Sequence, residues 1–126
     1  ALGLRATLMF DLAPDEYHTN VVLAVLAGRA AIVCPAGIAD PAVVEAIAAL
    51  YAPNAVLLSA EEQAAFAGNA ISLSDDSVWM SERAARALAP ASREALSAAG
   101  FAVRGVPLDA IEAAGGSLRC CVAEIY

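Results

Sequence analysis

The chain has 126 residues, 60% of them hydrophobic, and a formal net charge of −7 at pH 7. This length fits one domain or part of one. The acidic charge, with seven arginines and no lysine, argues against a nucleic-acid-binding surface. No apolar run reaches the ~20 residues that a membrane span needs, no signal peptide opens the chain, and three cysteines do not form a disulfide framework. We expect a cytoplasmic protein, and because it begins at Ala1 rather than methionine, a processed or truncated product.

The predicted elements follow one another in a pattern that repeats at a spacing of about 49 residues. A strand over 6–10 and a short helical link over 12–17 form the tail of one copy. The first full copy then has a hairpin over 20–34 that turns at Ala27-Gly28, a helix over 41–51 with Val43, Val44, Ile47 and Leu50 on one face, a strand over 55–59 and a short helix over 60–66.

The second copy follows the same order. It has a hairpin over 69–81 that turns at Asp75-Asp76, two helical pieces over 81–99 broken at Pro90, a strand over 101–106 and a short helix over 108–114. Residues 117–126 then predict the first strand of a third copy. The repeated unit is therefore strand, strand, helix, strand and short link, present about two and a half times.

Such repeats usually bury each other's faces. If the units close into a ring, the segments that open each hairpin lie around one mouth. These segments are 17–20, 67–69 and 116–120.

Two of these segments carry residues suited to thiolate catalysis. Cys120 follows the glycine pair Gly115-Gly116 and is expected to begin a strand, and His18, the chain's only histidine, leads into another. A cysteine and a histidine that meet only in the fold are the minimal set for nucleophilic catalysis by a thiolate. Taken alone, a histidine before a strand is more often a surface or capping residue.

Three segments resemble the guanidine-modifying enzymes. They are Tyr17-His18-Thr19-Asn20-Val21, Phe66-Ala67-Gly68-Asn69 and Gly115-Gly116-Ser117-Leu118-Arg119-Cys120. The group includes arginine deiminases, dimethylarginine hydrolases, amidinotransferases and the citrulline-utilisation hydrolases, which the chain resembles most. The resemblance implies an α/β pentein fold, a propeller of five ββαβ units, and makes residues 1–126 the C-terminal half of such a domain.

The resemblance also implies roles for five residues. Cys120 falls on the nucleophile and His18 on the general acid and base, while Asn20, Asn69 and Ser117 are expected to bind substrate; no metal and no cofactor is implied. Arginine deiminases carry an acidic residue where this chain has Asn20, which argues against a plain arginine deiminase. Asn20 and Asn69 are equally well explained as turn residues that satisfy backbone groups.

The expected activity is that of a cysteine-dependent hydrolase or amidinotransferase in arginine metabolism. Cys120 would attack the guanidino or ureido carbon of a small cationic or zwitterionic arginine-like compound and form a covalent thiouronium intermediate. A missing N-terminal half, or self-association, is expected to complete the pocket. The alternative is a non-catalytic binding or assembly module of the same fold.

Other titratable and aromatic residues have plainer explanations. Cys34 is expected in the core, and Cys121 is expected to be buried as a small apolar residue. A zinc site that combines Cys34, Cys120, Cys121 and His18 lacks the C-x2-C pattern and is not expected. We expect solvated carboxylates at Glu61, Glu62, Asp75 and Asp76, and core packing for Phe66 and Trp79.

Overall fold

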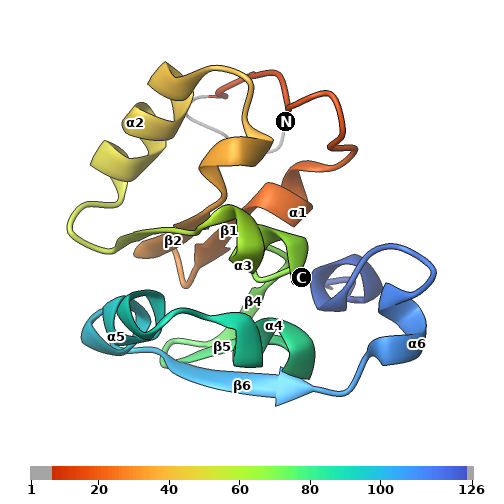
Figure 1. The fold of residues 1–126 in the computed structure, drawn as a ribbon. Coiled ribbons are helices and arrows are strands. Elements are labelled where there is room, and N and C mark those ends of the chain that lie inside the picture. The colour runs from red at the N-terminus through yellow and green to blue at the C-terminus, as the bar shows by residue number, and fades with distance from the viewer. Residues whose placement is uncertain (1–6, 125–126) are drawn as a thin grey trace.

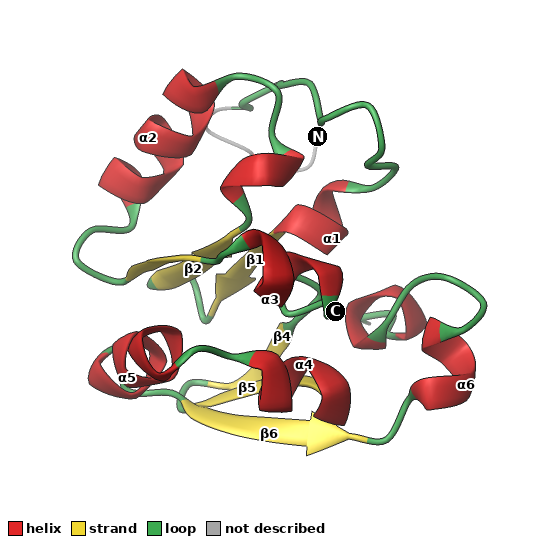
Figure 2. Ribbon diagram, viewed as in Figure 1, coloured by secondary structure: helices red, strands yellow, loops and turns green. Residues whose placement is uncertain are grey.

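Two three-stranded sheets form the frame of the protein, for which a computed structural model describes residues 7–124 (Figures 1 and 2). The elements in chain order are α1 (Thr19–Val22), β1 (Leu23–Leu26), β2 (Ala30–Val33), η1 (Pro35–Gly37), α2 (Pro41–Leu50), β3 (Ala55–Leu57), α3 (Ala60–Ala64), β4 (Ile71–Ser74), β5 (Ser77–Ser81), α4 (Glu82–Ala87), α5 (Pro90–Ala98), β6 (Ala102–Val106), α6 (Asp109–Glu112) and η2 (Leu118–Cys121).

The two sheets have the same topology, which confirms the predicted repeat. In the first, β1 pairs antiparallel with β2, and β2 pairs parallel with β3 after the crossover through α2. In the second, β4 pairs antiparallel with β5, and β5 pairs parallel with β6 after the crossover through α4 and α5. The first strands of the two units, β1 and β4, lie against each other. Residues 7–124 therefore contain two complete ββαβ units.

Both hairpins turn where the sequence predicts. Ala27 and Gly28 have φ angles of 48° and 66°, and the N–H of Arg29 donates to the carbonyl of Leu26 at 3.0 Å. Two consecutive positive φ angles are the signature of the type I′ turn, whose twist matches that of the flanking strands. In the second hairpin Asp75 and Asp76 connect β4 to β5.

Two of the crossover helices, α2 and α5, begin at prolines. In α2 the Asp40 carboxylate accepts from the N–H of Ala42 at 2.9 Å and Pro41 occupies the first turn, so the start is both capped and preset. Pro90 opens α5 and thereby separates it from α4, as predicted. The prediction that Leu50 lies on the buried face of α2 is wrong: Leu50 is the last residue of the helix and is 75% exposed, while Val44 and Ile47 are buried.

One hydrophobic core runs through both units. Its fully buried large side chains include Leu26, Ile32 and Val33 from the first hairpin, Met80 from the second and Leu96 from α5. Because β1 and β4 are in contact, each unit covers apolar surface of the other, as expected for stacked repeats. No helix within residues 7–124 is long and apolar enough to cross a membrane.

The two half-units at the ends differ from the prediction. Residues 7–10 form no strand, and in place of a helix over 12–17 the chain makes an isolated bridge between Leu12 and Ile38 and then a turn. Residue 6, the start of the expected strand, lies outside the described residues. The helical turn comes later, as α1, which precedes β1 directly.

The C-terminal segment is a 3₁₀ turn rather than a strand. The N–H of Cys120 donates to the carbonyl of Ser117 at 3.2 Å, and that of Val122 to Arg119 at 3.4 Å. These hydrogen bonds satisfy backbone groups within the segment itself, whereas the expected strand would need a neighbouring strand as its hydrogen-bonding partner. Residues 125 and 126 lie outside the described part.

Three side-chain predictions change with the structure. Glu62 is 3% exposed rather than solvated, and Cys121 is exposed rather than buried. Phe66 and Trp79 are half-buried; Phe66 packs against the core. Glu62 tolerates burial because its carboxylate accepts the N–H groups of Ser59 at 2.7 Å and Ala89 at 2.9 Å.

Candidate active site

The three segments predicted to share one mouth do meet, and Asn69 joins them. The side-chain amide of Asn69 donates to the main-chain carbonyl of Asn20 at 2.8 Å and to the sulfur of Cys120 at 3.3 Å. Its Oδ1 accepts from the backbone N–H groups of Arg119 at 2.9 Å and Cys120 at 3.4 Å. Asn69 is fully buried and satisfies three main-chain groups, as its alternative explanation expects, and it also contacts the sulfur; its predicted contact with substrate stays a prediction.

A tight turn after α3 presents Asn69. Phe66 has a φ of 64°, its carbonyl accepts the N–H of Asn69 at 2.9 Å, and the N–H of Ala67 bonds back to Glu62 at 3.0 Å. Gly68 allows this turn to lie close against the first hairpin, since a Cβ there would lie 2.4 Å from the carbonyl oxygen of Val21. The local fold therefore requires glycine immediately before the residue that contacts the sulfur.

Cys120 lies in η2 with its side chain exposed to solvent. Its thiol points at two amides: it accepts the N–H of Asn69, and it can donate to Oδ1 of Asn20 at 3.8 Å. Gly116 precedes it with a φ of 92°, a conformation that favours glycine. An N–H donor aimed at the sulfur is a favourable contact when the sulfur carries negative charge, which is the reactive state of a cysteine.

His18 stands at the start of α1. It is exposed, and its ring packs edge-on against Tyr17 with 5.1 Å between ring centroids. The helix that follows it lies against η2, the turn that carries Cys120. The fold thus brings the histidine and cysteine segments to one side of the molecule, while the catalytic role of His18 stays a prediction.

Ser117 is fully buried, and its hydroxyl donates to Oε1 of Glu112 at 2.6 Å. Its predicted contact with substrate stays a prediction. Asn20 is half-buried, and its Oδ1 lies 3.8 Å from the sulfur of Cys120, farther than the Asn69 amide at 3.3 Å. Its predicted role in substrate binding stays a prediction.

The other cysteines occupy different environments. Cys34 is fully buried, and burial, together with the carboxylates of Glu16 and Glu62, raises its pKa to about 12. It is therefore held as a neutral thiol in the core. Cys121 is exposed beside Cys120. Within the described residues, no three His, Cys, Asp or Glu side chains gather in a way that would hold a metal ion.

A cavity of about 500 Å³ lies along β1 and β4; Asn20 is part of its lining, whereas Cys120 and His18 are not. Asn20 and Ser72 line it, as do the strands β1 and β4, and Arg119 and Glu124 form an ion pair of 2.9 Å at its edge. Arg119 has no role predicted from the sequence, although its position next to Cys120 is a usable signal. Glu112 likewise has no predicted role, because nothing in the local sequence distinguishes it from a solvated carboxylate.

Comparison with solved structures gives the fold. The apo crystal structure of ArgZ, an arginine dihydrolase from the ornithine-ammonia cycle in cyanobacteria, superposes with a TM-score of 0.73 at 25% identity over 88% of this chain and 17% of that one. The product-bound N-terminal domain of ArgZ matches with a TM-score of 0.68 at 26% identity over 82% of this chain and 36% of the domain.

Unliganded AgrE matches with a TM-score of 0.68 at 24% identity, over 82% of this chain and 15% of that one. The chain thus spans a minor part of each of these proteins. No curated protein matches it. The fold is the mixed α/β pentein fold of the guanidine-modifying enzymes, as the resemblance implied. The family model for N,N dimethylarginine dimethylhydrolase, eukaryotic, matches residues 11–126, and the chain belongs to this family.

Proposed function

We propose that Cys120 is the nucleophile of a hydrolase that cleaves a C–N bond at the guanidino carbon of an arginine-like substrate. The contact of the Asn69 amide with the Cys120 sulfur, at 3.3 Å, supports this proposal most strongly. It combines an exposed thiol with a buried N–H donor whose other hydrogen bonds fix its position. A structural cysteine, such as Cys34, is buried away from solvent instead.

In the proposed reaction the Cys120 thiolate adds to the guanidino carbon and forms a C–S bond. Collapse of this adduct breaks one C–N bond, and His18 gives a proton to the amine that leaves. Water, deprotonated by His18, then attacks the thiouronium carbon. The C–S bond breaks, a ureido product departs and the thiol is restored. If the substrate's alkyl amine is the group that leaves, only the amidino group stays on the sulfur, and attack by an acceptor amine in place of water makes the enzyme an amidinotransferase.

The comparisons support this chemistry. The chain belongs to a family named for dimethylarginine hydrolysis. A cysteine-to-serine variant of the ArgZ N-terminal domain has been seen bound to substrate, and another variant is covalently bound to a reaction intermediate. Both matches have identities of 25% or 26% and TM-scores of 0.68.

The proposal assigns only part of the site to this chain. A guanidinium is a weak electrophile whose charge is delocalised, so catalysis needs carboxylates that hold it in place. The residues around Cys120 supply amides, from Asn20 and Asn69, rather than carboxylates. We infer that the clamping carboxylates come from a preceding half-ring or from a second copy of the chain, in which case this chain contributes the nucleophile and the histidine.

The test is turnover of a panel of arginine, methylated arginines, agmatine and citrulline, with products identified by mass spectrometry. Activity that is lost in Cys120→Ser and kept in Cys121→Ser, its exposed neighbour, supports the proposal. The product distinguishes the acceptors, because a ureido compound requires water and a transferred amidino group requires an amine. Activity that survives in Cys120→Ser contradicts the proposal. Specific binding without turnover, in this chain and in one extended by the preceding half, favours the non-catalytic alternative.

A further inference from the structure

A buried carboxylate is linked directly to the turn that carries Cys120 and, through an arginine, to the segment that leads to Asn69. Glu112, at the end of α6, accepts the hydroxyl of Ser117 on Oε1 at 2.6 Å. Its main-chain carbonyl accepts the N–H of Gly115 at 3.2 Å. The residue therefore holds the start of the Cys120 turn at two points, and its side chain is only 3% exposed.

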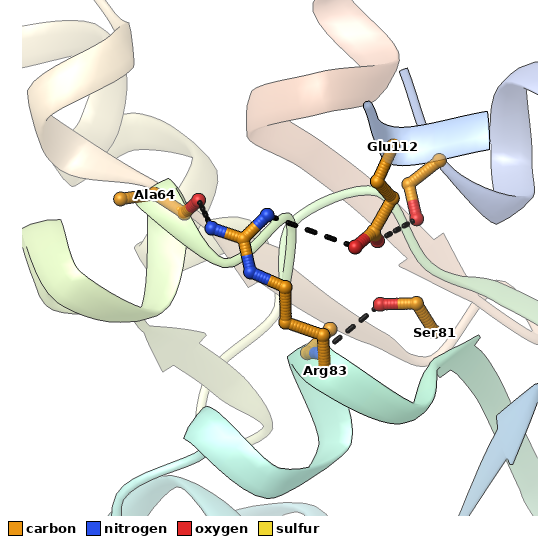
Figure 3. Close-up of polar contacts among 6 residues, drawn as sticks. Ala64, Ser81, Arg83 and Glu112 are labelled. Atoms are coloured by element: carbon orange, nitrogen blue, oxygen red, sulfur yellow. Dashed lines mark hydrogen bonds and ion pairs between the residues drawn. The ribbon is translucent and has the colours of Figure 1, made fainter. Parts of the chain in front are cut away.

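The second oxygen of Glu112 faces Arg83. The distance from Oε2 to Nη1 of Arg83 is 3.7 Å, a charge contact rather than a hydrogen bond, and Figure 3 shows the guanidinium between Glu112 and Ala64. Nη2 of the same arginine donates to the carbonyl of Ala64, the last residue of α3, at 3.1 Å. The guanidinium also lies 6.0 Å from the centre of the Phe66 ring.

Arg83 thus touches the turn that presents Asn69, because Phe66 accepts the N–H of Asn69. Glu112 touches the turn that presents Cys120, because the carbonyl of Ser117 accepts the N–H of Cys120. The two turns meet where Asn69 donates to the sulfur. Glu112 and Arg83 form a second connection between the same two turns.

We propose that Glu112 and Arg83 are positioning residues, which hold the Cys120 sulfur within hydrogen-bonding distance of the Asn69 amide. The inference rests on the proposed role of Cys120 as nucleophile. A shift of about 1 Å at a reacting group can lower a rate by about 100-fold, so loss of this link affects the sulfur although neither side chain touches substrate. The Ser117 hydroxyl is the connection between Glu112 and the turn.

The test compares Ser117→Ala, Glu112→Gln and Glu112→Ala, all in a Cys121→Ser background so that Cys120 is the exposed thiol being modified. The matched control is Arg86→Gln, which breaks the exposed i,i+4 pair with Glu82 on α4. We measure kcat and KM, and the rate of alkylation of Cys120 by iodoacetamide as a function of pH. Circular dichroism reports whether each variant folds.

We expect kcat to fall by about tenfold or more in Ser117→Ala and Glu112→Ala, with KM changed less than about threefold, because the chemical step rather than binding is affected. The pH midpoint of Cys120 alkylation moves upward in both. Glu112→Gln keeps an acceptor for Ser117 but loses the attraction for Arg83, so it falls between wild type and Glu112→Ala. Arg86→Gln behaves as wild type.

The inference is overturned if the three variants fold and keep kcat and the alkylation profile of wild type, or if Glu112→Ala raises KM alone. If Glu112→Ala does not fold, the inference is tested on Ser117→Ala alone, because this variant removes only one hydroxyl. If wild type shows no turnover, the alkylation profiles still decide. A shifted profile then supports the positioning role while the proposed reaction fails, so the two failures are distinguishable.

Discussion

Replacing Asn20 by aspartate places a negative charge next to the sulfur with almost no change in shape. Oδ1 of Asn20 lies 3.8 Å from Sγ of Cys120. The hydrogen bond from Asn69 goes to the main-chain carbonyl of Asn20, so the substitution leaves it in place. The only large change is the charge, which opposes the formation of a thiolate.

Coulomb's law sets the size of the effect. Two unit charges about 4 Å apart repel by about 1 kcal/mol in water and by about 4 kcal/mol at an effective dielectric constant near 20. Because Cys120 is exposed, solvent screens the pair and the lower part of this range applies. About 1.4 kcal/mol corresponds to a tenfold smaller thiolate fraction. We therefore expect alkylation of Cys120 near neutral pH to slow by about tenfold in Asn20→Asp.

The assay is the rate of reaction with iodoacetamide, a neutral reagent, in a Cys121→Ser background at low and high salt. Asn20→Ser is the control, because it removes the amide without adding charge. The slowing in Asn20→Asp should diminish as salt is raised. If Asn20→Asp reacts as fast as wild type, the side chain of residue 20 does not lie beside the Cys120 sulfur. If Asn20→Ser slows the reaction equally, loss of the amide rather than the added charge is the cause. Either result would refute the reasoning.

Three further predictions concern the frame of the site. Gly68→Ala should lower the free energy of unfolding by about 1–3 kcal/mol in urea titrations, because its Cβ would lie 2.4 Å from the carbonyl oxygen of Val21 and 2.6 Å from the sulfur of Cys34; an unchanged midpoint would contradict the close approach. Ala27→Asn should raise it by about 0.5–1 kcal/mol, since asparagine followed by glycine suits the two positive φ angles of the turn. Burial raises the pKa of Glu62, but hydrogen bonds from main-chain and hydroxyl donors outweigh burial and leave it lowered. Wild type should therefore be more stable than Glu62→Gln, and this difference should be complete above the pKa of about 4.3 that the carboxyl has in the unfolded chain. The difference should shrink as pH falls through the lower pKa of the folded protein. Thermal melts in which it grows on acidification would contradict this.

The repeated elements could be predicted because their signals are local. Ala27-Gly28 marks a hairpin turn and Pro90 a helix start, and the structure has both where the sequence indicates. The meeting of the Asn69 and Cys120 segments also follows from the repeat, since equivalent positions of stacked units lie side by side.

What the sequence could not show depends on distant partners. Glu62 is buried because Ala89, 27 residues along the chain, supplies a donor, and Glu112 is buried because Ser117 and Arg83 face it. The segment around Cys120 has strand composition, but the described residues form a 3₁₀ turn closed by bonds three residues apart. Composition carries no information about whether a strand finds a partner.

The most direct test of the central claim is the mass of the protein quenched in acid during reaction with an arginine-like substrate. If Cys120 is the nucleophile, an adduct with the mass of the substrate less the amine that leaves appears on the intact chain, maps to Cys120 by fragmentation and is absent from Cys120→Ser. An adduct that maps to Cys121 instead would contradict the account. So would turnover that forms no covalent adduct in either a burst or a steady-state quench, together with full activity of Cys120→Ser.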